Sequence, residues 1–394
     1  MRSVKCLIHI ADPSKFLDQA LGLFEEVLPG RNRVFLRQRV NDFEISSVTA
    51  EHVFYESENA EAYESELEKS CLEACGVVVH FLNSEYKRKL ILRLPADLSV
   101  VWFSWGPDLW VVPNMYRKLY APLTYRMLIP KYHHLRKILY SIRDLFNKSN
   151  FINELTFFCG HREKVSIAFN AIKRTNYIAT VIPDEYERLR RSFDYKGEYV
   201  KWNYQSCLNL LTTDVVTGNK VLVGHSSHAI NNHFDCFDAL MRKEITQDVV
   251  IPCSYGDYDY RARLITVGKA LFGPRFQPIT DFMSFKDYAQ MLQSCSAAIM
   301  GQYCQQGLGT AIILLWNGTK LFLSNRNPMF SFFISNQLKC FSIEKDLNSA
   351  RLDVPLRMDE IAQNRDILQR LYGHEQLLAN TKSLCDMLES YRHG

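Results

Sequence analysis

The sequence contains no apolar run approaching the roughly 18–20 residues that a membrane-spanning helix needs. It also has no Cys-x-x-Cys pair, and its 11 cysteines are scattered and odd in number, which does not favour a disulfide framework. Its start, MRSVKCLIHIADPSKF, has a short apolar stretch followed by Asp12, which is typical of a first β-strand and not of a signal peptide. These absences favour a cytosolic protein with reduced, mostly buried thiols.

Several catalytic signatures are missing as well. There is no GxxxxGK[ST] loop for ATP, and GLGTAI at 307–312 is only part of a dinucleotide-binding GxGxxG. His228 and His233 are five residues apart, whereas the zinc motif HExxH needs a four-residue step and a Glu. Asp257 and Asp259 form an Asp-x-Asp, which some metal-using glycosyltransferases place on Mn, but this short pattern lies in a Tyr-rich turn. We therefore predict neither a metal nor a cofactor.

The composition is that of an ordinary globular protein, with 47% apolar and 23% charged residues in 394. This length predicts two domains of roughly 150–200 residues. The net charge of +4 is uneven, because residues 117–148 carry a local balance of +7 and the remainder −3. Basic residues interleaved with Tyr, Leu and Ile suit an anionic membrane surface or a nucleic acid. The plain alternative is a solvated helix face.

Short β-branched runs alternate with helical patterns, which predicts parallel, doubly wound sheets. A first series of strands is predicted at 4–10, 33–36, 52–55, 76–82 and 99–105, and a second at 220–224, 248–252, 276–280, 296–300 and 320–324. We expect an α/β fold of two Rossmann-like domains, 1–195 and 196–394, facing each other across a cleft. Residues 195–219 form the crossover, and a terminal helix at 358–393 packs back across both domains. Ligands of such sheets bind beyond the carboxyl ends of the strands.

Three polar groups gather at the predicted strand ends of the first domain: Asp12, His80 and Asp108. Each has a structural alternative. Aspartate beside proline is commonly a helix cap or a turn former, which applies to Asp12 and Asp108. A histidine inside an apolar strand, such as His80, can be a hydrogen-bonded core residue.

The strand ends of the second domain are richer in polar residues. After residues 220–224 comes HSSHAINNH, after 248–252 CSYGD, and after 296–300 GQYCQQG. Their side chains and free glycine amides suit a diphosphate and a sugar, and Tyr255 could stack on a base. Gly307 and Gly309 stand directly before a predicted helix at 310–317. They either make a simple turn and cap, or leave the helix N-terminus open to an anion such as phosphate.

Four segments, in order, carry a family resemblance: WFSWGPDLW, VLVGHSSHAINNHFDCFDAL, VVIPCSYG and QQGLGTAIILLWNGTKLFLSNRNPMF. They resemble the 4-acetamidofucosyltransferases of enterobacterial common antigen synthesis over about residues 76–330. His225 and His228 stand where that family has Asn and Asp, and the segment 131–164 is longer here.

The resemblance implies an inverting, metal-independent transferase of the GT-B type. It would move 4-acetamido-4,6-dideoxygalactose from a dTDP carrier to a polyprenyl-diphosphate-linked glycan. Asp12 is then the first candidate for the catalytic base, Asp108 the second and His80 the third. The implied donor-binding residues are Gly224, Ser226, Ser227, Asn232, Tyr255, Gln305, Gln306, Gly307, Gly309, Thr310, Asn325 and Arg326.

A lipid-linked acceptor would explain the basic segment 117–148. The first domain would then dock on anionic headgroups at the cytoplasmic face of the inner membrane. The candidate contacts are Tyr116, Arg117, Lys118, Tyr120, Arg126, Lys131, Arg136 and Lys137. Two other hypotheses stay open. One is a GT-B transferase with another nucleotide sugar, such as a UDP sugar, and a polysaccharide or protein acceptor. The other is a basic binding or adaptor protein; no nucleic-acid partner is expected.

Overall fold

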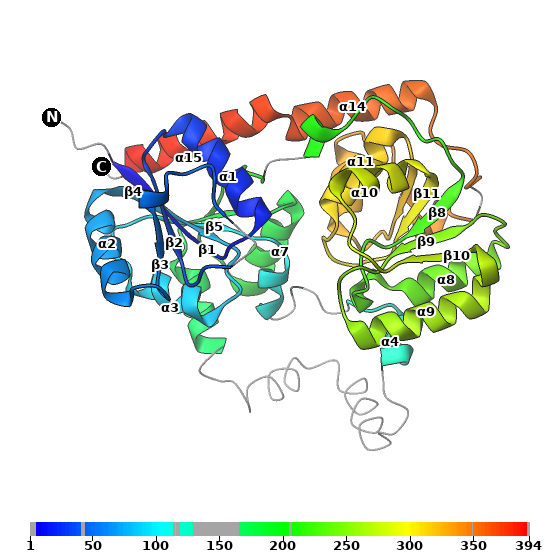
Figure 1. The fold of residues 1–394 in the computed structure, drawn as a ribbon, viewed down its shortest axis with the longest axis horizontal. Helices are drawn as coiled ribbons and strands as arrows, with labels where there is room; N and C mark the ends of the chain where they lie inside the picture. The colour runs from blue at the N-terminus through cyan, green and yellow to red at the C-terminus, as the bar shows by residue number, and fades with distance from the viewer. Residues whose placement is uncertain are drawn as a thin grey trace, which may run out of the picture. The chain divides into compact units, whose positions relative to one another are not determined.

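The computed structural model describes residues 5–40, 44–112, 115, 119–128, 165–204, 207–348 and 350–391. The chain divides into two compact units (Figure 1). The first is built from described residues of 1–115, 146–205 and 374–394, and the second from described residues of 116–145 and 206–373.

The first unit is a parallel sheet of seven strands in the order β3-β2-β1-β4-β5-β6-β7. The central strands are apolar on both faces, as a sheet covered by helices on both sides requires. The strands are β1 (Cys6–Ala11), β2 (Asn32–Leu36), β3 (Val53–Tyr55), β4 (Ala74–His80), β5 (Val100–Phe103), β6 (Tyr177–Ala179) and β7 (Glu198–Tyr199).

Helices flank this sheet (Figure 1). They are α1 (Lys15–Val27), α2 (Ala60–Glu73), α3 (Glu85–Arg93), α7 (Pro183–Phe193) and α15 (His374–Tyr391), with 3-10 turns η1 (Ala50–His52) and η2 (Pro107–Val111). Leu17, Leu21 and Phe24 recur at helical spacing in α1 and are buried. The Ser14 hydroxyl caps α1 by accepting a hydrogen bond from Leu17 N, so the chain turns sharply after Asp12 and Pro13.

The second unit is a parallel sheet of six strands in the order β10-β9-β8-β11-β12-β13. Its strands are β8 (Lys220–Val223), β9 (Val249–Pro252), β10 (Phe276–Ile279), β11 (Cys295–Met300), β12 (Lys320–Leu323) and β13 (Phe341–Ser342). Its helices are α4 (Pro122–Leu128), α8 (His233–Arg242), α9 (Tyr258–Phe272), α10 (Phe285–Gln293), α11 (Leu308–Asn317), α12 (Pro328–Ser335), α13 (Ile343–Asp346) and α14 (Met358–Tyr372), with 3-10 turns η3 (Cys207–Leu210), η4 (Ala229–Asn231) and η5 (Gly273–Arg275).

The predicted pair of parallel α/β sheets is confirmed. The strands that the pattern missed are β6, β7 and β13, which have two or three residues and are too short to show a period. The predicted terminal helix is two helices separated by Gly373. The first of them, α14, packs on α11 of the second unit, and α15 packs on α1 and β4 of the first.

The observed units are not two continuous halves of the chain. The predicted division after residue 195 lies ten residues before the observed change of unit, and the terminal helix α15 contributes to the first unit. The segment with α4, predicted for the first domain, belongs to the second. The reason is a set of side-chain contacts, because the Asp235 carboxylate accepts hydrogen bonds from Leu123 N and Thr124 N at the start of α4.

Candidate active site

In the first unit, the candidate residues lie at the carboxyl ends of the neighbouring strands β1, β4 and β5. Asp12 and Asp108 follow their strands, and His80 is the last residue of β4. Asp12 comes directly after β1, and 45% of its side-chain surface is exposed. Its Oδ2 accepts a hydrogen bond of 2.6 Å from the ammonium of Lys87, a side chain of α3 that is fully buried. The Lys87 ammonium also donates to the His80 carbonyl at 3.1 Å. Asp12 is therefore an exposed carboxylate held by a buried cation.

His80 lies inside a chain of hydrogen bonds between buried side chains. Its Nδ1 is 2.9 Å from the Tyr204 hydroxyl, and its Nε2 is 3.1 Å from His9 Nδ1. His9 Nε2 donates to Asn32 Oδ1 at 3.0 Å, because the Asn32 amide nitrogen is itself a donor to Glu25. The direction of the whole chain follows: Tyr204 O–H donates to His80, and His80 Nε2–H donates to His9. Burial lowers the pKa of His80 well below its ordinary value, and both of its nitrogens are engaged.

Asp108 is also enclosed, with only 2% of its surface exposed. Its carboxylate accepts four hydrogen bonds, from Trp102 Nε1 (2.7 Å), Ser104 Oγ (2.9 Å), Leu82 N (3.0 Å) and Trp105 N (3.1 Å). Burial raises the pKa of Asp108, and the hydrogen bond from Trp102 is the largest influence in the opposite direction. This geometry fixes the turn after β5. Of the three candidates for the base, only Asp12 has an exposed side chain, since His80 and Asp108 are both buried.

In the second unit, the turn after β8 is closely packed. Gly224 has φ +66°, and a Cβ there would lie 2.6 Å from His233 Nε2, so a side chain has no room. The Ser226 hydroxyl accepts a hydrogen bond of 3.2 Å from the Asn231 amide, and the Ser227 hydroxyl donates to the Tyr255 carbonyl at 2.7 Å. Tyr255, after β9, is 54% exposed. The Ser226 bond braces the turn after β8, and the Ser227 bond joins it to the turn after β9, while the Tyr255 ring stays accessible.

The N-terminus of α11 has no side-chain cap. The residue at the cap position is Gly307, with φ +69°, where an added Cβ would lie 2.9 Å from the His225 ring. Gly309 is exposed in the first turn of α11, and a Cβ added there meets nothing within 4 Å. Thr310 Oγ1 is engaged with the Tyr288 hydroxyl at 2.9 Å. Packing requires glycine at 307 but not at 309, where the open backbone suits close approach of a ligand.

Three glutamines of the loop between β11 and α11 carry unpaired acceptors. The Oε1 atoms of Gln302, Gln305 and Gln306 are buried and have no hydrogen-bond partner among the described residues. Gln302 uses its amide nitrogen to approach His225 Nδ1 at 3.2 Å and to donate to the Gln306 carbonyl at 3.3 Å. Burial lowers the pKa of His225 to about 4, so its ring is neutral and Nδ1 can accept. Buried carbonyl oxygens without donors are costly, which makes this loop receptive to hydroxyl or amide groups of a ligand.

The remaining donor candidates differ in their surroundings. Asn232 is buried, and its side chain accepts from Ala121 N and donates to the Gly301 carbonyl, both at 2.8 Å, so it ties the segment before α4 to the loop after β11. Asn325 and Arg326 are exposed after β12. The Arg326 guanidinium lies 3.9 Å from the centre of the Tyr303 ring, a cation–π contact that holds it beside the loop after β11.

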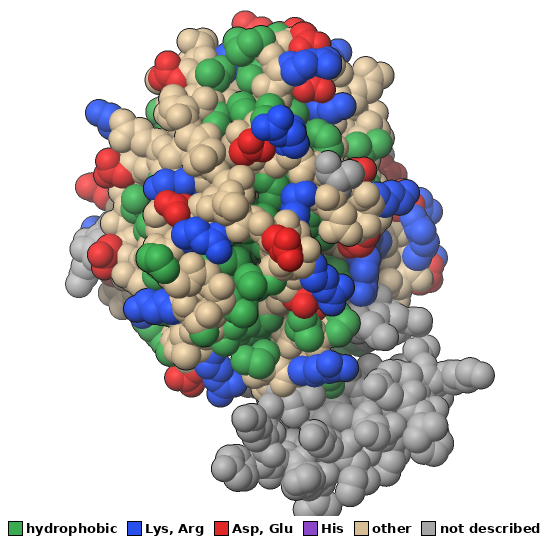
Figure 2. All heavy atoms as spheres, turned by 90° about the vertical axis from the view of Figure 1, so that its right-hand side faces the viewer, with side chains coloured by type: hydrophobic (Ala, Val, Ile, Leu, Met, Phe, Trp, Pro, Cys, Tyr) green, Lys and Arg blue, Asp and Glu red, His purple; other side chains and the backbone are tan. Residues whose placement is uncertain are grey.

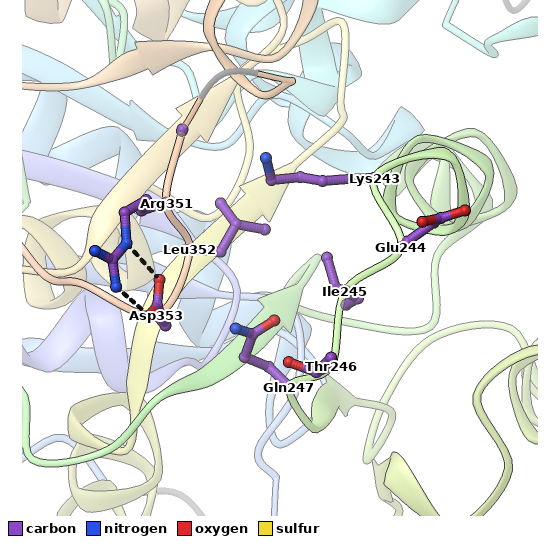
Figure 3. Close-up of a pocket in the computed structure, with 9 residues that line it drawn as sticks. Lys243, Glu244, Ile245, Thr246, Gln247, Arg351, Leu352 and Asp353 are labelled. Carbon is purple, nitrogen blue, oxygen red and sulfur yellow. Dashed lines mark hydrogen bonds and ion pairs between the residues drawn. The ribbon is translucent and has the colours of Figure 1, made fainter.

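A pocket of about 190 Å³ lies elsewhere in the second unit (Figure 3). It is lined by residues 243–247, which precede β9, and by 350–353, where Arg351 and Asp353 form an ion pair. These residues lie at the amino ends of the strands, whereas the candidate residues follow the carboxyl ends. Its volume is below the ~300–1,000 Å³ of usual ligand pockets, and we assign it no role.

The described residues show neither a metal centre nor a membrane span. No group of three or more His, Cys, Asp or Glu is placed to hold a metal ion there. No helix in this part of the chain is long and apolar enough to span a bilayer. Of the predicted membrane contacts, Tyr120 and Arg126 are exposed. The others, Tyr116, Arg117, Lys118, Lys131, Arg136 and Lys137, lie outside the described residues.

Sequence reasoning did not single out Lys87, and it included Gln302 only as part of the stretch GQYCQQG. Lys87 had a usable signal, because its spacing places it on one helical face with Leu90 and Ile91, both of which are buried in α3. A lysine at an apolar position of a helix predicts a buried partner of opposite charge. The sequence could not show that the side-chain oxygen of Gln302 is unpaired, since this depends on how the loop after β11 packs on His225.

Residues 192–364 match the model of the family described as 4-alpha-L-fucosyltransferase, glycosyl transferase group 56. The matched segment contains every donor candidate named above. It confirms the resemblance to a fucosyltransferase family that the motifs indicated.

Solved structures share the two-unit fold at low sequence identity. Sucrose-phosphate synthase from Thermosynechococcus elongatus aligns with a TM-score of 0.60 and 12% identity, covering 98% of this chain and 100% of that one. Anabaena HepE in complex with UDP-glucose aligns with a TM-score of 0.52 and 11% identity, covering 98% and 97%. The alpha,alpha-trehalose-phosphate synthase of Burkholderia xenovorans, in complex with glucose-6-phosphate, aligns with a TM-score of 0.54 and 10% identity, covering 98% and 100%.

These neighbours have the predicted GT-B fold. The fold is therefore of the GT-B type, and the family match over residues 192–364 supports a glycosyltransferase.

Proposed function

We propose that this enzyme is an inverting, metal-independent transferase that moves a deoxy-amino sugar from a dTDP-linked donor to a lipid-linked glycan. One observation carries the donor half of the proposal. The uncapped N-terminus of α11 lies beside three buried glutamine oxygens that lack partners in the described part of the chain. An anion and a set of O–H or N–H donors would satisfy this arrangement together, and a nucleotide sugar has both.

The donor diphosphate is assigned to the first turn of α11. The open backbone at Gly309 lets an anion approach the helix amides, which carry the positive end of the helix dipole. Negative charge develops on the diphosphate as it leaves, and one fixed donor aimed at such charge is typically worth ~3–4 kcal/mol in the barrier. Gln302, Gln305 and Gln306 accept from hydroxyl or amide groups of the sugar, and Tyr255 stacks on the base.

Proton abstraction is assigned to Asp12 of the first unit. The acceptor oxygen forms a bond to the anomeric carbon while the bond from that carbon to the diphosphate breaks. The proton of the acceptor hydroxyl passes to the Asp12 carboxylate, and the electron pair leaves with the nucleotide diphosphate. Attack from the face opposite the leaving group inverts the configuration, as in inverting glycosidases with water replaced by a sugar hydroxyl.

The identities of donor and acceptor come from the family resemblance. They are dTDP-linked 4-acetamido-4,6-dideoxygalactose and a polyprenyl-diphosphate-linked glycan, used by a peripheral enzyme at the cytoplasmic face of the inner membrane. Because HepE is solved with UDP-glucose, a UDP-linked donor is a second candidate. It would go with a polysaccharide or protein acceptor. The adaptor hypothesis predicts binding of neither nucleotide.

The experiment is a binding titration of dTDP and UDP against wild type and Gly309→Val. A Cβ at 309 has open space, so the variant should melt close to the wild-type temperature. The Val side chain would occupy the space of the phosphate, and we expect nucleotide affinity to fall at least ~10-fold, about 1.4 kcal/mol.

Gly318→Ala is the matched control at the other end of α11. A Cβ there would lie 2.4 Å from Ile361 Cδ1, and Gly318 has φ +90°, so this variant should lose stability and keep its nucleotide affinity. If Gly309→Val binds dTDP and UDP as wild type does, α11 is not the phosphate site. Mass spectrometry with a panel of dTDP and UDP sugars then identifies the donor by the nucleotide released.

A further inference from the structure

Lys87 is a buried cation on the face of α3 that packs into the apolar interior. It is fully buried and shares its face of α3 with Leu90 and Ile91. Its ammonium lies 2.6 Å from Asp12 Oδ2 and 3.1 Å from the His80 carbonyl, and it is 5.5 Å from the centre of the Phe81 ring. Two hydrogen bonds therefore fix the ammonium between the ends of β1 and β4.

Stability does not account for this lysine. Removing a charge from water costs several kcal/mol, and an apolar side chain of similar volume in place of a buried ion pair is often neutral or stabilising. Burial lowers the pKa of Lys87, while the charge and hydrogen bond of Asp12 raise it. The other charges that act on Lys87 are buried Asp108, which favours the cation, and Arg88, which opposes it. His80, the remaining neighbour, is held neutral by burial.

Asp12 is held by one oxygen only. Its Oδ2 is bound to Lys87, whereas its Oδ1 accepts no hydrogen bond from the described residues. The next residue after His80, Phe81, has φ +56°, a conformation that is costly for a residue other than glycine. Such strain is commonly stored beside functional groups. The buried Lys87 ammonium thus holds one oxygen of the exposed Asp12 carboxylate, and the other oxygen is available to a substrate.

We infer that Lys87 is a positioning residue for catalysis, which holds Asp12 by Oδ2 so that Oδ1 faces the acceptor hydroxyl. The inference rests on the proposed function, in which Asp12 is the base. A second assignment follows for His80. Its backbone carbonyl anchors the ammonium, and its side chain is locked by Tyr204 and His9, so it supports Asp12 and does not exchange protons with the substrate.

A double-mutant cycle tests this inference. Turnover is measured as release of dTDP or UDP, using the sugar of the panel that the enzyme turns over fastest. We expect Asp12→Asn to lose about 10²–10⁴-fold, the usual worth of a general base. Lys87→Met should lose roughly 10–100-fold with nucleotide affinity unchanged, since misplacement of a catalytic group costs about that much. The double variant should be no slower than Asp12→Asn alone, because Lys87 acts only through Asp12.

The outcomes separate the two proposals. If no sugar is turned over, or if Asp12→Asn is as fast as wild type, the assignment of Asp12 as base fails and that of Lys87 fails with it. If Asp12→Asn is slow and Lys87→Met is as fast as wild type, only the role of Lys87 is overturned. That role is also overturned if Lys87→Met causes an equal loss in both backgrounds, as a purely structural residue would. Should the Met variant not fold, Lys87→Gln, which keeps a donor without the charge, completes the cycle.

Discussion

Four histidines of this protein are buried and neutral: His9, His80, His225 and His233. In each case burial is the first cause of a lowered pKa, to about 4 for His9 and His225, to about 3 for His233, and well below the ordinary value for His80. Hydrogen bonds hold them in place, with His9 bound to Asn32 and His233 beside the Tyr260 hydroxyl at 3.1 Å. A neutral ring suits these sites because no carboxylate compensates a charge there in the described structure.

The pH dependence of stability follows from these shifts. In the unfolded chain a histidine binds a proton below about pH 6.5, whereas the folded sites stay neutral down to about pH 4. The unfolded state then holds more protons, so the stability present above pH 6.5 is lost as the pH falls toward 4. Each histidine contributes up to about 1.4 kcal/mol per pH unit in this window.

We therefore expect the melting temperature to fall steeply between pH 7 and pH 5, where carboxylates still remain mostly ionised. Thermal unfolding across that range checks it. His9→Gln, which can still donate to Asn32, should reduce the slope of melting temperature against pH by the contribution of one histidine. A melting temperature that is constant from pH 7 to pH 5 would contradict the assignment of these histidines as neutral and buried.

At the scale of the elements, the helix N-termini of the protein fall into two kinds. Most well-defined helices carry a side-chain cap, as Ser84 caps α3, Ser284 caps α10 and Asp257 caps α9. The α11 helix has Gly307 instead and no such cap. The helices α7 and α8 also lack a side-chain cap, although a cap contributes about 1 kcal/mol. The feature that is consistent with a ligand at α11 is the open terminus together with the unpaired glutamine oxygens of the preceding loop.

Asp257 could serve as a helix cap or as a metal ligand, and substitutions distinguish these two roles. Its Oδ1 accepts a hydrogen bond of 2.7 Å from Tyr260 N, so Asp257→Ala should lower the unfolding free energy by about 1 kcal/mol. Asp259→Ala, two residues on and exposed, is the matched control and should change stability by less than about 0.5 kcal/mol. Turnover should persist in EDTA for wild type and both variants. Loss of turnover in EDTA that Mn²⁺ restores would instead make the Asp-x-Asp a metal site.

At the scale of the whole molecule, charge is distributed unevenly along the chain. Basic, acidic and apolar side chains are interspersed on the face shown in Figure 2. The concentration of positive charge is in residues 117–148, with a balance of +7 against −3 for the remainder. Its described part, around α4, belongs to the second unit and exposes Tyr120, Tyr125 and Met127 beside Arg126. We therefore propose that membrane docking is a property of the donor-binding unit.

Binding to vesicles of acidic phospholipid should weaken as salt rises, because charges are screened over ~8 Å at physiological ionic strength. Each basic residue near such a surface is worth roughly 1 kcal/mol. Reversing Arg117, Lys118 and Arg126 to Glu should release the protein, while its affinity for dTDP stays as in wild type. Co-sedimentation with vesicles measures the first and titration the second. Binding that is insensitive to salt and to the reversals would make the segment an ordinary solvated surface.

Local pattern was enough for much of this protein. The alternation of short apolar strands with helices predicted both parallel sheets. Because the strands of a parallel sheet end at one edge, the positions of Asp12, His80 and Asp108 at the carboxyl ends of β1, β4 and β5 could also be predicted. The motif QQGLGT predicted a turn before a buried helix, and the family match covers it.

Contacts between distant residues decided the rest. Asp12 and Asp108 look alike in the sequence, each beside a proline, yet the fold buries one under four hydrogen bonds and exposes the other. Lys87 meets Asp12 across 75 residues, and Asn232 meets Ala121 across 111, so no local pattern could reveal either pair. Secondary structure follows from the periodic pattern of apolar and polar side chains along the chain. Burial arises only when distant segments exclude water from one another, and burial decides the chemical role of each carboxylate.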